Sequence, residues 1–163
     1  MQSFADALRV LERMKREGVV EDYAIAGAMA LIFWTEPVPT FDLDVLVFLP
    51  GDEGAIVSLS PLYAWAVANG YSARGEHVTI EGIPVQFLPS HGDLADEAIE
   101  SAASLDYEGV NVRVVRPEYL VALYLEPGAR TRKRRERAAA LMESDSIDRA
   151  ALDGLLARFG LAP

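Results

Sequence analysis

Two aspartates, Asp42 and Asp44, interrupt the otherwise apolar segment FDLDVLVFLP at residues 41–50. Its β-branched and aromatic residues, closed by Pro50 and Gly51, predict a β-strand. Side chains two positions apart on a strand point to the same face, with Cα atoms about 6.5–7 Å apart. Because carboxylates are costly in such a place unless they are solvated or paired, the pair indicates either an exposed strand edge or a bound cation.

Divalent cations are the usual partners of paired carboxylates. Mg²⁺ prefers one or two carboxylates together with substrate phosphates, so a strand-borne DLD favours half of a phosphoryl-transfer site. A solvated strand edge remains the alternative, because D-x-D is a common spacing. Phosphatases of the haloacid dehalogenase type also begin with D-x-D, but they continue with small residues where this chain has Val45 and Leu46. Glycosyltransferases that use D-x-D are normally much larger.

Composition is typical of one globular domain in a chain of 163 residues, with 51% hydrophobic and 25% charged residues. There is no cysteine, which excludes disulfides and thiolate metal sites. No apolar run reaches the roughly 18 residues of a membrane span, and the N-terminus predicts an amphipathic helix rather than a signal peptide. We therefore expect a cytoplasmic protein without membrane contact.

Local sequence patterns predict strands interleaved with helices, followed by a helical tail. A glutamate and a glycine, Glu81-Gly82, mark a hairpin turn, and Pro117 marks a helix start. Ser3 and Ser60 are expected to cap the first turns of two helices. Helices are expected near residues 4–17, 28–34, 60–70, 92–103, 117–126, 130–143 and 147–158, and strands near 19–27, 41–50, 71–89 and 107–115.

This order favours an α/β or α+β fold, a mixed β-sheet flanked by helices. We expect a single domain over residues 1–163, with an α/β core at about 1–125 and C-terminal helices at 126–163.

Several short motifs, in order, resemble the nucleotidyltransferase superfamily, the polymerase-beta-like fold in its minimal bacterial form. A strand ends at IAGAMAL, and TFDLDVLVF follows after a loop. GIPVQFLPS lies where the family has a strand with a third acid, and RPEYLVALYLEPGARTRKRRERAAALMES is similar to a late helical segment of the family. The resemblance covers about residues 20–160 and is closest to abortive-infection, toxin-type nucleotidyltransferases.

The resemblance implies roles for individual residues. Asp42 and Asp44 would hold Mg²⁺ or Mn²⁺ and act in catalysis, while Gly27 and Ala28 would contact the phosphates of an NTP. The position of the third catalytic acid is occupied by Gln86. An amide cannot act as a general base, so a module that binds nucleotide, RNA or a partner protein without turnover is the alternative to an enzyme.

Glu81 and Asp106 are weaker substitutes for the third acid. Tyr124 stands where the family has a lysine, and either Trp34 or Tyr124 is a candidate for a base pocket. We expect surface or structural roles for His77 and His91.

The charge of the chain is strongly asymmetric. The net charge is −10, yet residues 130–137, RTRKRRER, carry +5, which leaves −15 for the remainder. Arginine clusters bind phosphates, so Arg130 and Lys133 are candidate nucleotide contacts and the run is a candidate RNA or tRNA contact. A solvated helix face is the alternative. Transfer of an NMP to an RNA, protein or small-molecule hydroxyl is the expected activity, and the toxin-type resemblance implies an antitoxin as a possible protein partner.

Overall fold

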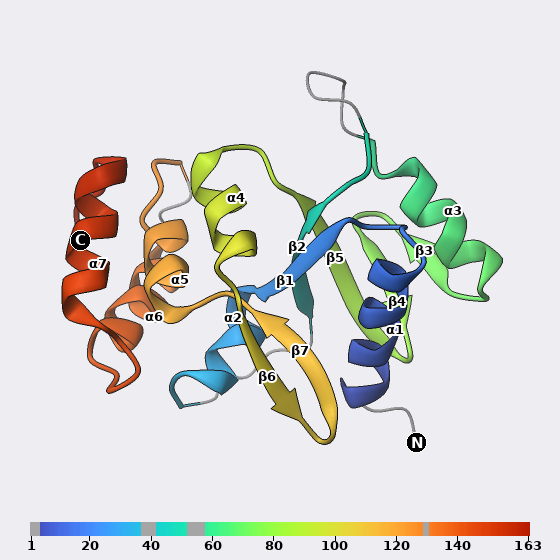
Figure 1. Ribbon diagram of the computed structural model, residues 1–163, viewed down its shortest axis with the longest axis horizontal. Helices are drawn as coiled ribbons and strands as arrows, with labels where there is room; N and C mark the ends of the chain where they lie inside the picture. Colours follow the sequence, from blue (N-terminus) through green and yellow to red (C-terminus); the bar gives the residue numbers. More distant parts are fainter. Residues whose placement is uncertain (1–3, 37–41, 52–57, 129–130) are drawn as a thin grey trace.

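A seven-stranded mixed sheet with helices on its sides and at one end forms the molecule (Figure 1). The computed structural model describes residues 4–36, 42–51, 58–128 and 131–163. The helices are α1 (Phe4–Arg16), α2 (Gly27–Ala30), the 3₁₀ turn η1 (Leu31–Phe33), α3 (Ser60–Ala68), α4 (Asp93–Glu100), α5 (Pro117–Tyr124), α6 (Arg132–Met142) and α7 (Arg149–Phe159). The strands are β1 (Asp22–Ala26), β2 (Leu43–Phe48), β3 (Ser72–Arg74), β4 (His77–Ile80), β5 (Ile83–Pro89), β6 (Ala103–Tyr107) and β7 (Val110–Val114).

The strand order across the sheet is β3-β4-β5-β2-β1-β7-β6. β2 lies at the centre, antiparallel to β1 and parallel to β5. This pairing places Asp44 of β2 level with Ala26 of β1 on one side and with Gln86 of β5 on the other. Because paired residues on neighbouring strands project to the same face, Asp44 and Gln86 are on one face of the sheet.

The core follows the apolar pattern of the sequence. The central strands are buried almost throughout. The buried residues are Tyr23 through Ala26 in β1, and Leu43 and Val45 through Val47 in β2. α1 buries one face, which includes Leu8, Leu11 and Met14, as its 3.6-residue periodicity requires. A single cluster of buried residues therefore joins the sheet to the helices on its faces.

Two hairpins, between β4 and β5 and between β6 and β7, turn at a Glu-Gly pair. Glu81 and Gly82 both have positive φ (51° and 80°), and Glu108 and Gly109 share this feature (49° and 82°). Positive φ at both central residues matches the right-handed twist of the flanking strands. The turn predicted at Glu81-Gly82 is therefore confirmed.

The last three helices pack together beside the sheet, at the end where Figure 1 shows α5, α6 and α7. Thr131 caps α6 by accepting from the backbone N–H of Arg134 at 3.1 Å, and Asp148 caps α7 in the same way. Gly160 ends α7 in the left-handed conformation. α5 contacts both other helices and also borders the sheet, so it connects the helical end to the core.

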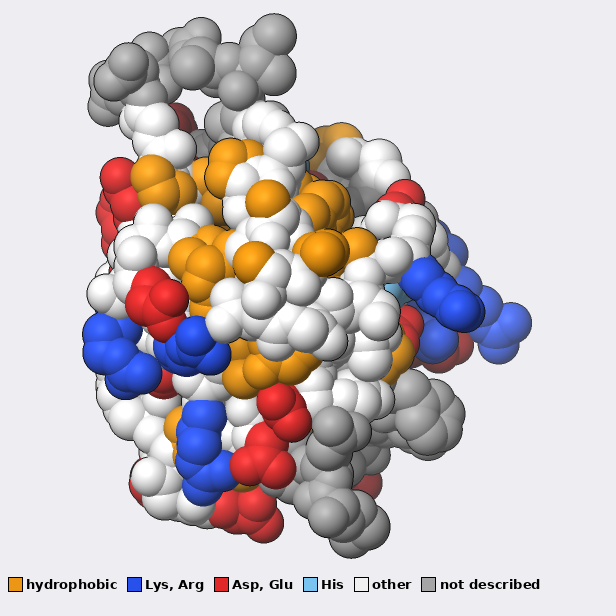
Figure 2. All heavy atoms as spheres, turned by 90° about the vertical axis from the view of Figure 1, so that its right-hand side faces the viewer, with side chains coloured by type: hydrophobic (Ala, Val, Ile, Leu, Met, Phe, Trp, Pro, Cys, Tyr) orange, Lys and Arg blue, Asp and Glu red, His pale blue; other side chains and the backbone are white. Residues whose placement is uncertain are grey.

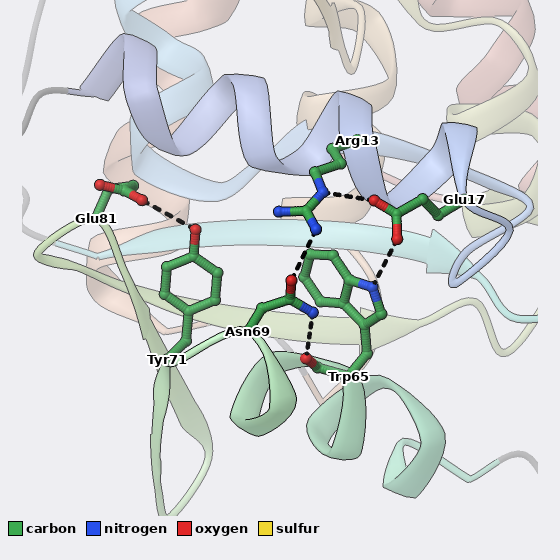
Figure 3. A network of polar contacts seen from close by, with 6 residues as sticks. All are labelled: Arg13, Glu17, Trp65, Asn69, Tyr71 and Glu81. Carbon is green, nitrogen blue, oxygen red and sulfur yellow. Dashed lines mark hydrogen bonds and ion pairs between the residues drawn. The ribbon is translucent and has the colours of Figure 1, made fainter.

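A polar network joins α1, α3 and the β4–β5 hairpin (Figure 3). The Arg13 guanidinium donates to Asn69 at 2.7 Å and lies 5.2 Å from the centre of the Trp65 ring. The Trp65 indole N–H donates to Glu17 at 3.2 Å. Glu81 accepts from the Tyr71 hydroxyl at 2.9 Å, which fixes the hairpin to the end of α3.

On the side that carries α3, hydrophobic side chains gather at the surface (Figure 2). Among the residues the structure describes, Val67 of α3 is the large hydrophobic residue that is mostly exposed, with 60% of its surface accessible. None of the helices described is long and apolar enough to cross a membrane.

Most predicted elements are present, with corrections at their ends. Asp42 precedes β2 rather than lying inside it, and its side chain is 56% exposed. Ser60 is the first residue of α3 and is not the cap, because Leu59 occupies that position. Ser3, the cap expected for the first helix, lies outside the described residues.

Candidate active site

Gly27 and Asp44 are in direct contact where β1 ends and β2 begins. Gly27 has φ +63°, and a Cβ atom built on it would lie 2.3 Å from Asp44 Oδ2. Both the left-handed backbone and this close approach require glycine. The residue that follows β1 therefore lies in close contact with the Asp44 carboxylate of the D-x-D pair.

Asp44 also faces an open cavity of about 720 Å³ between the sheet and the C-terminal helices. One wall is the sheet, with Gly27, Asp44 and Leu46, and the opposite wall is formed by α5 and the segment after it. The guanidinium-bearing residues Arg134 and Arg137 of α6 complete the rim. The remaining lining residues are Ala26, Leu88, Pro89, His91, Leu120, Leu123, Tyr124, Glu126, Pro127 and Gly128.

The charges around Asp44 act on it from both sides. Burial raises the pKa of the Asp44 carboxyl above its usual value, and the negative charge of Asp42 raises it further. The positive groups of Arg134, His77 and Arg137 oppose this increase. Asp44 and the two arginines thus interact electrostatically across one cavity. Such a cavity suits a ligand that carries both a bound cation and several phosphate charges.

A buried hydroxyl in this cavity has no protein partner of suitable geometry among the described residues. Tyr124 is 4% exposed and lines the cavity, and its hydroxyl oxygen makes no hydrogen bond there. Burial raises the pKa of this phenol, and the nearby Arg137 guanidinium, which acts by its charge and as a poorly aligned donor, partly opposes the increase. A buried hydroxyl without a well-formed hydrogen bond is a place where a ligand or a water can supply one.

Comparisons with known proteins find similarity to solved structures. No protein-family model matches the chain, and no curated protein sequence matches it. Among solved structures, the antibiotic-resistance factor ANT(2″)-Ia matches with a TM-score of 0.55 at 18% identity, over 95% of this chain and 90% of its own. Its crystal structure with adenylyl-2″-tobramycin matches with a TM-score of 0.56 at 17% identity, over 95% of both chains.

A third solved structure, an antigenic nucleotidyltransferase-like protein from Paracoccidioides brasiliensis, covers 96% of this chain and 89% of its own, with a TM-score of 0.53 at 14% identity. The chain has the nucleotidyltransferase fold. The expectation drawn from the sequence motifs is therefore confirmed at the level of the fold. At these identities the shared architecture carries no assignment of substrate.

Within the nucleotidyltransferase fold, the two residues predicted to contact phosphate have different positions. Gly27 lines the cavity, whereas Ala28 is 7% exposed and is not part of the lining. α2, which begins at Gly27, has only four residues and continues as the 3₁₀ turn η1. Gly27 is thus the residue of this pair that a ligand would meet.

Gln86, the residue predicted for the third position of the site, pairs with Asp44 in the sheet, but its side chain bonds to another partner. Its Nε2 donates to Glu76 Oε2 at 3.3 Å, in the hairpin between β3 and β4. Glu81 lies in the turn that precedes β5. At least three residues of strand, or about 10 Å, therefore separate it from Gln86. Asp106 is on the edge strand β6. Neither residue lines the cavity.

Of the two predicted basic contacts, Lys133 is not part of the cavity lining that the described residues form. Arg130 lies outside the described residues, and Lys133 is exposed on α6. The lining instead includes Arg134 and Arg137. Helical periodicity contained this signal, because α6 buries Ala138 and Leu141, and residue 134 precedes them by four and seven positions on the same face.

The sequence analysis did not predict where the two histidines lie, and it left the aromatic residue of the site open between Trp34 and Tyr124. His91 lines the cavity, and His77 Nε2 lies 3.8 Å from Asp42 Oδ2. No single-residue signal predicted either position, because strand pairing places His77 and the loop between β5 and α4 places His91. Tyr124 lines the cavity as one of the two candidates expected, while the Trp34 indole donates to the carbonyl of Val115 at 2.9 Å and serves the packing.

The residues present fit a divalent cation by their donor chemistry. Asp42 and Asp44 supply carboxylate oxygens, which Mg²⁺ and Mn²⁺ both accept. Among the residues described, no group of three His, Cys, Asp or Glu side chains already converges on one point. The side chain of Asp42 is 56% exposed, and joint coordination with Asp44 would require side-chain adjustment.

Proposed function

We propose that this protein is a nucleotidyltransferase that moves an NMP from an NTP to a hydroxyl group of an RNA, a protein or a small molecule, with Mg²⁺ or Mn²⁺. The observation that carries this proposal is the cavity in which Asp44 faces Arg134 and Arg137. A triphosphate with a bound divalent ion carries the complementary charges. The fold neighbour ANT(2″)-Ia was solved with adenylyl-2″-tobramycin, a small molecule that carries an adenylyl group.

The chain's own residues would bind and orient the nucleotide. Arg134 and Arg137 would hold the phosphates by charge-assisted hydrogen bonds, which guanidinium groups form in pairs. Gly27, which lacks a side chain, would let the phosphates approach the sheet. Asp42 and Asp44 would hold the divalent ion, which when bound stabilises the charge that develops on the transferred phosphoryl group. The Tyr124 hydroxyl would gain its missing partner from the ligand.

An RNA and an acidic protein are the further partners that we propose. Arg132 and Arg135 of α6 are exposed and do not line the cavity, so they are available to an RNA backbone or to an acidic protein partner such as an antitoxin. Phosphate contacts of this kind bind without reading sequence.

Transfer of label from each of the four α-³²P NTPs, with Mg²⁺ or Mn²⁺ and with total RNA or cell lysate as acceptor, tests the activity. Label transfer should disappear in Asp44→Asn. The proposal is wrong if the wild-type protein transfers no label that depends on this residue.

Nucleotide binding is tested separately by calorimetry with a non-hydrolysable NTP. Arg134→Ala should weaken binding by about tenfold or more, as expected for one charged hydrogen bond of about 1.5–3 kcal/mol. Arg135→Ala removes the same charge from the same helix away from the cavity, and it should retain the wild-type affinity. Equal losses in both variants would show that only general charge matters.

A binding module without turnover is the second candidate, and Gln86 is the observation that favours it. The amide next to Asp44 cannot accept a proton from the acceptor hydroxyl, and the loss of one general acid–base group typically costs about 10²–10⁴ in rate. Nucleotide binding without label transfer would support this candidate. A gain of transfer in Gln86→Asp would then identify a site that has lost its third acid.

A further inference from the structure

His77 lies in the same cross-strand row as the proposed metal-binding residues. Val78 of β4 pairs with Val85 of β5, so the preceding residue of β4, His77, lies level with Gln86, which in turn pairs with Asp44 of β2. Residues level with each other on neighbouring strands share a face. Two strand spacings of about 4.8 Å separate the Cα atoms of His77 and Asp44, a span that these side chains bridge when both reach toward one ion.

His77 and Asp42 are close enough to reach one ion after side-chain adjustment. His77 Nε2 lies 3.8 Å from Asp42 Oδ2, the distance of a loose ion pair and too long for a hydrogen bond. Ligands at about 2.1 Å from an octahedral ion are about 3 Å apart when adjacent and about 4.2 Å apart when opposite. A shift of less than about 1 Å would bring the two atoms to the spacing of adjacent ligands, and Asp44 would have to turn toward the same point, because among the described residues no three such side chains converge yet.

Gln86, which lies between the two residues in the row, makes its side-chain hydrogen bond to another residue. Its amide donates to Glu76 at 3.3 Å and is thereby held toward the β3–β4 hairpin. His77 is 35% exposed in its side chain, so solvent and ions reach its imidazole. The hairpin that holds the amide therefore also presents the imidazole to the aspartates.

We propose that His77 is the third protein ligand of the divalent ion and that it makes the site prefer Mn²⁺ over Mg²⁺. Imidazole is a good ligand for transition metals, whereas Mg²⁺ prefers oxygen and keeps its water. The inference rests on the proposed function, because it concerns the ion held by Asp42 and Asp44. It adds a ligand and a selectivity that a pair of carboxylates does not supply.

The direct test is pulsed electron paramagnetic resonance of the full chain with one equivalent of Mn²⁺ and no nucleotide. Echo-envelope modulation from a coordinated ¹⁴N nucleus is expected in the wild-type protein and absent in His77→Gln. A histidine that serves only the packing would produce no such signal. Wild-type spectra without nitrogen modulation would overturn the proposal.

Affinity provides the second measurement. In titrations followed by the free Mn²⁺ signal, His77→Gln should weaken Mn²⁺ binding by about tenfold or more, since even the loss of an outer-shell partner costs 10- to 100-fold. Mg²⁺ affinity, measured by competition, should change by less than about twofold. Asp106→Asn removes a potential ligand from the edge strand β6, outside the cavity lining, and should leave Mn²⁺ affinity unchanged, which controls for unspecific binding.

The outcomes separate this inference from the proposed function. If Asp44→Asn weakens Mn²⁺ binding while His77→Gln does not, or if Asp106→Asn has an effect as large as His77→Gln, the role of His77 is refuted and the nucleotidyltransferase proposal stands. If the wild-type protein binds neither ion, with or without a non-hydrolysable NTP, both are refuted. Circular dichroism of each variant distinguishes loss of a ligand from loss of the fold.

Discussion

Substitution of Gly27 by alanine tests the contact on which the site is built. Alanine at φ +63° costs about 1–2 kcal/mol for the left-handed backbone alone. The added Cβ would also lie 2.3 Å from Asp44 Oδ2 and 3.0 Å from Asp44 Cβ. Rotation of the carboxylate off its rotamer costs about 0.5–1.5 kcal/mol, and the second contact requires a further small backbone shift. We expect a total loss of about 2–4 kcal/mol in the free energy of unfolding.

Gly160 provides a matched control. Its φ of +64° is nearly the same, and nothing lies within 4 Å of a Cβ built there. Gly160→Ala should therefore show the backbone cost alone, about 1–2 kcal/mol. Urea unfolding of both variants, followed by circular dichroism, measures the difference, and each 1 kcal/mol corresponds to about 2–4 °C in Tm for a chain of this size.

Two results would refute this reasoning. Equal losses in Gly27→Ala and Gly160→Ala would mean that the approach to Asp44 costs nothing. The double variant Gly27→Ala with Asp44→Ala should lose less than the sum of the single variants, because the overlapping carboxylate is gone. Strict additivity would place the cost elsewhere.

Two further predictions concern charge. Because burial and Asp42 raise the pKa of Asp44, the folded protein binds a proton there more tightly than the unfolded chain does, and ionisation as the pH rises costs stability. Asp44→Asn should therefore raise Tm at pH 7 in the absence of divalent ions, with a gain that shrinks toward pH 4; an equal gain at both pH values would contradict this. Arg13→Ala should lower stability by about 1 kcal/mol through loss of the contacts with Asn69 and Trp65, whereas Arg9→Ala, at an exposed ion pair, should cost less than about 0.5 kcal/mol in the same urea assay.

The fold was accessible from the sequence because it rests on local signals. The apolar runs, the Glu81-Gly82 turn and the short helix after Gly27 are each determined by neighbouring residues, and all appear in the structure. The proximity of Asp44 to Gly27 also followed from the order of motifs. Element ends were less accurate, as with Asp42, because the last residues of a strand depend on pairing rather than on composition.

The surroundings of the site were less predictable, since they depend on contacts between distant segments. The position of His77 beside Asp42 results from the register of three strands, and no pattern within β4 encodes that register. The same holds for the bond from Gln86 to Glu76. The choice of Arg134 over Lys133 was available from helix periodicity, but a run of six similar side chains conceals which face is turned inward.

The cavity combines charges from distant parts of the chain. The Asp44 carboxylate belongs to β2 in the middle of the sheet, and the guanidinium groups of Arg134 and Arg137 belong to α6, about ninety positions later. A ligand that contacts both would act as a reversible cross-link between the sheet and the C-terminal helices. Binding should then slow the hydrogen exchange of α6 amides more than that of β3 or β6 amides, which lie at the sheet edges, so that a helix outside the sheet reports occupancy of the site.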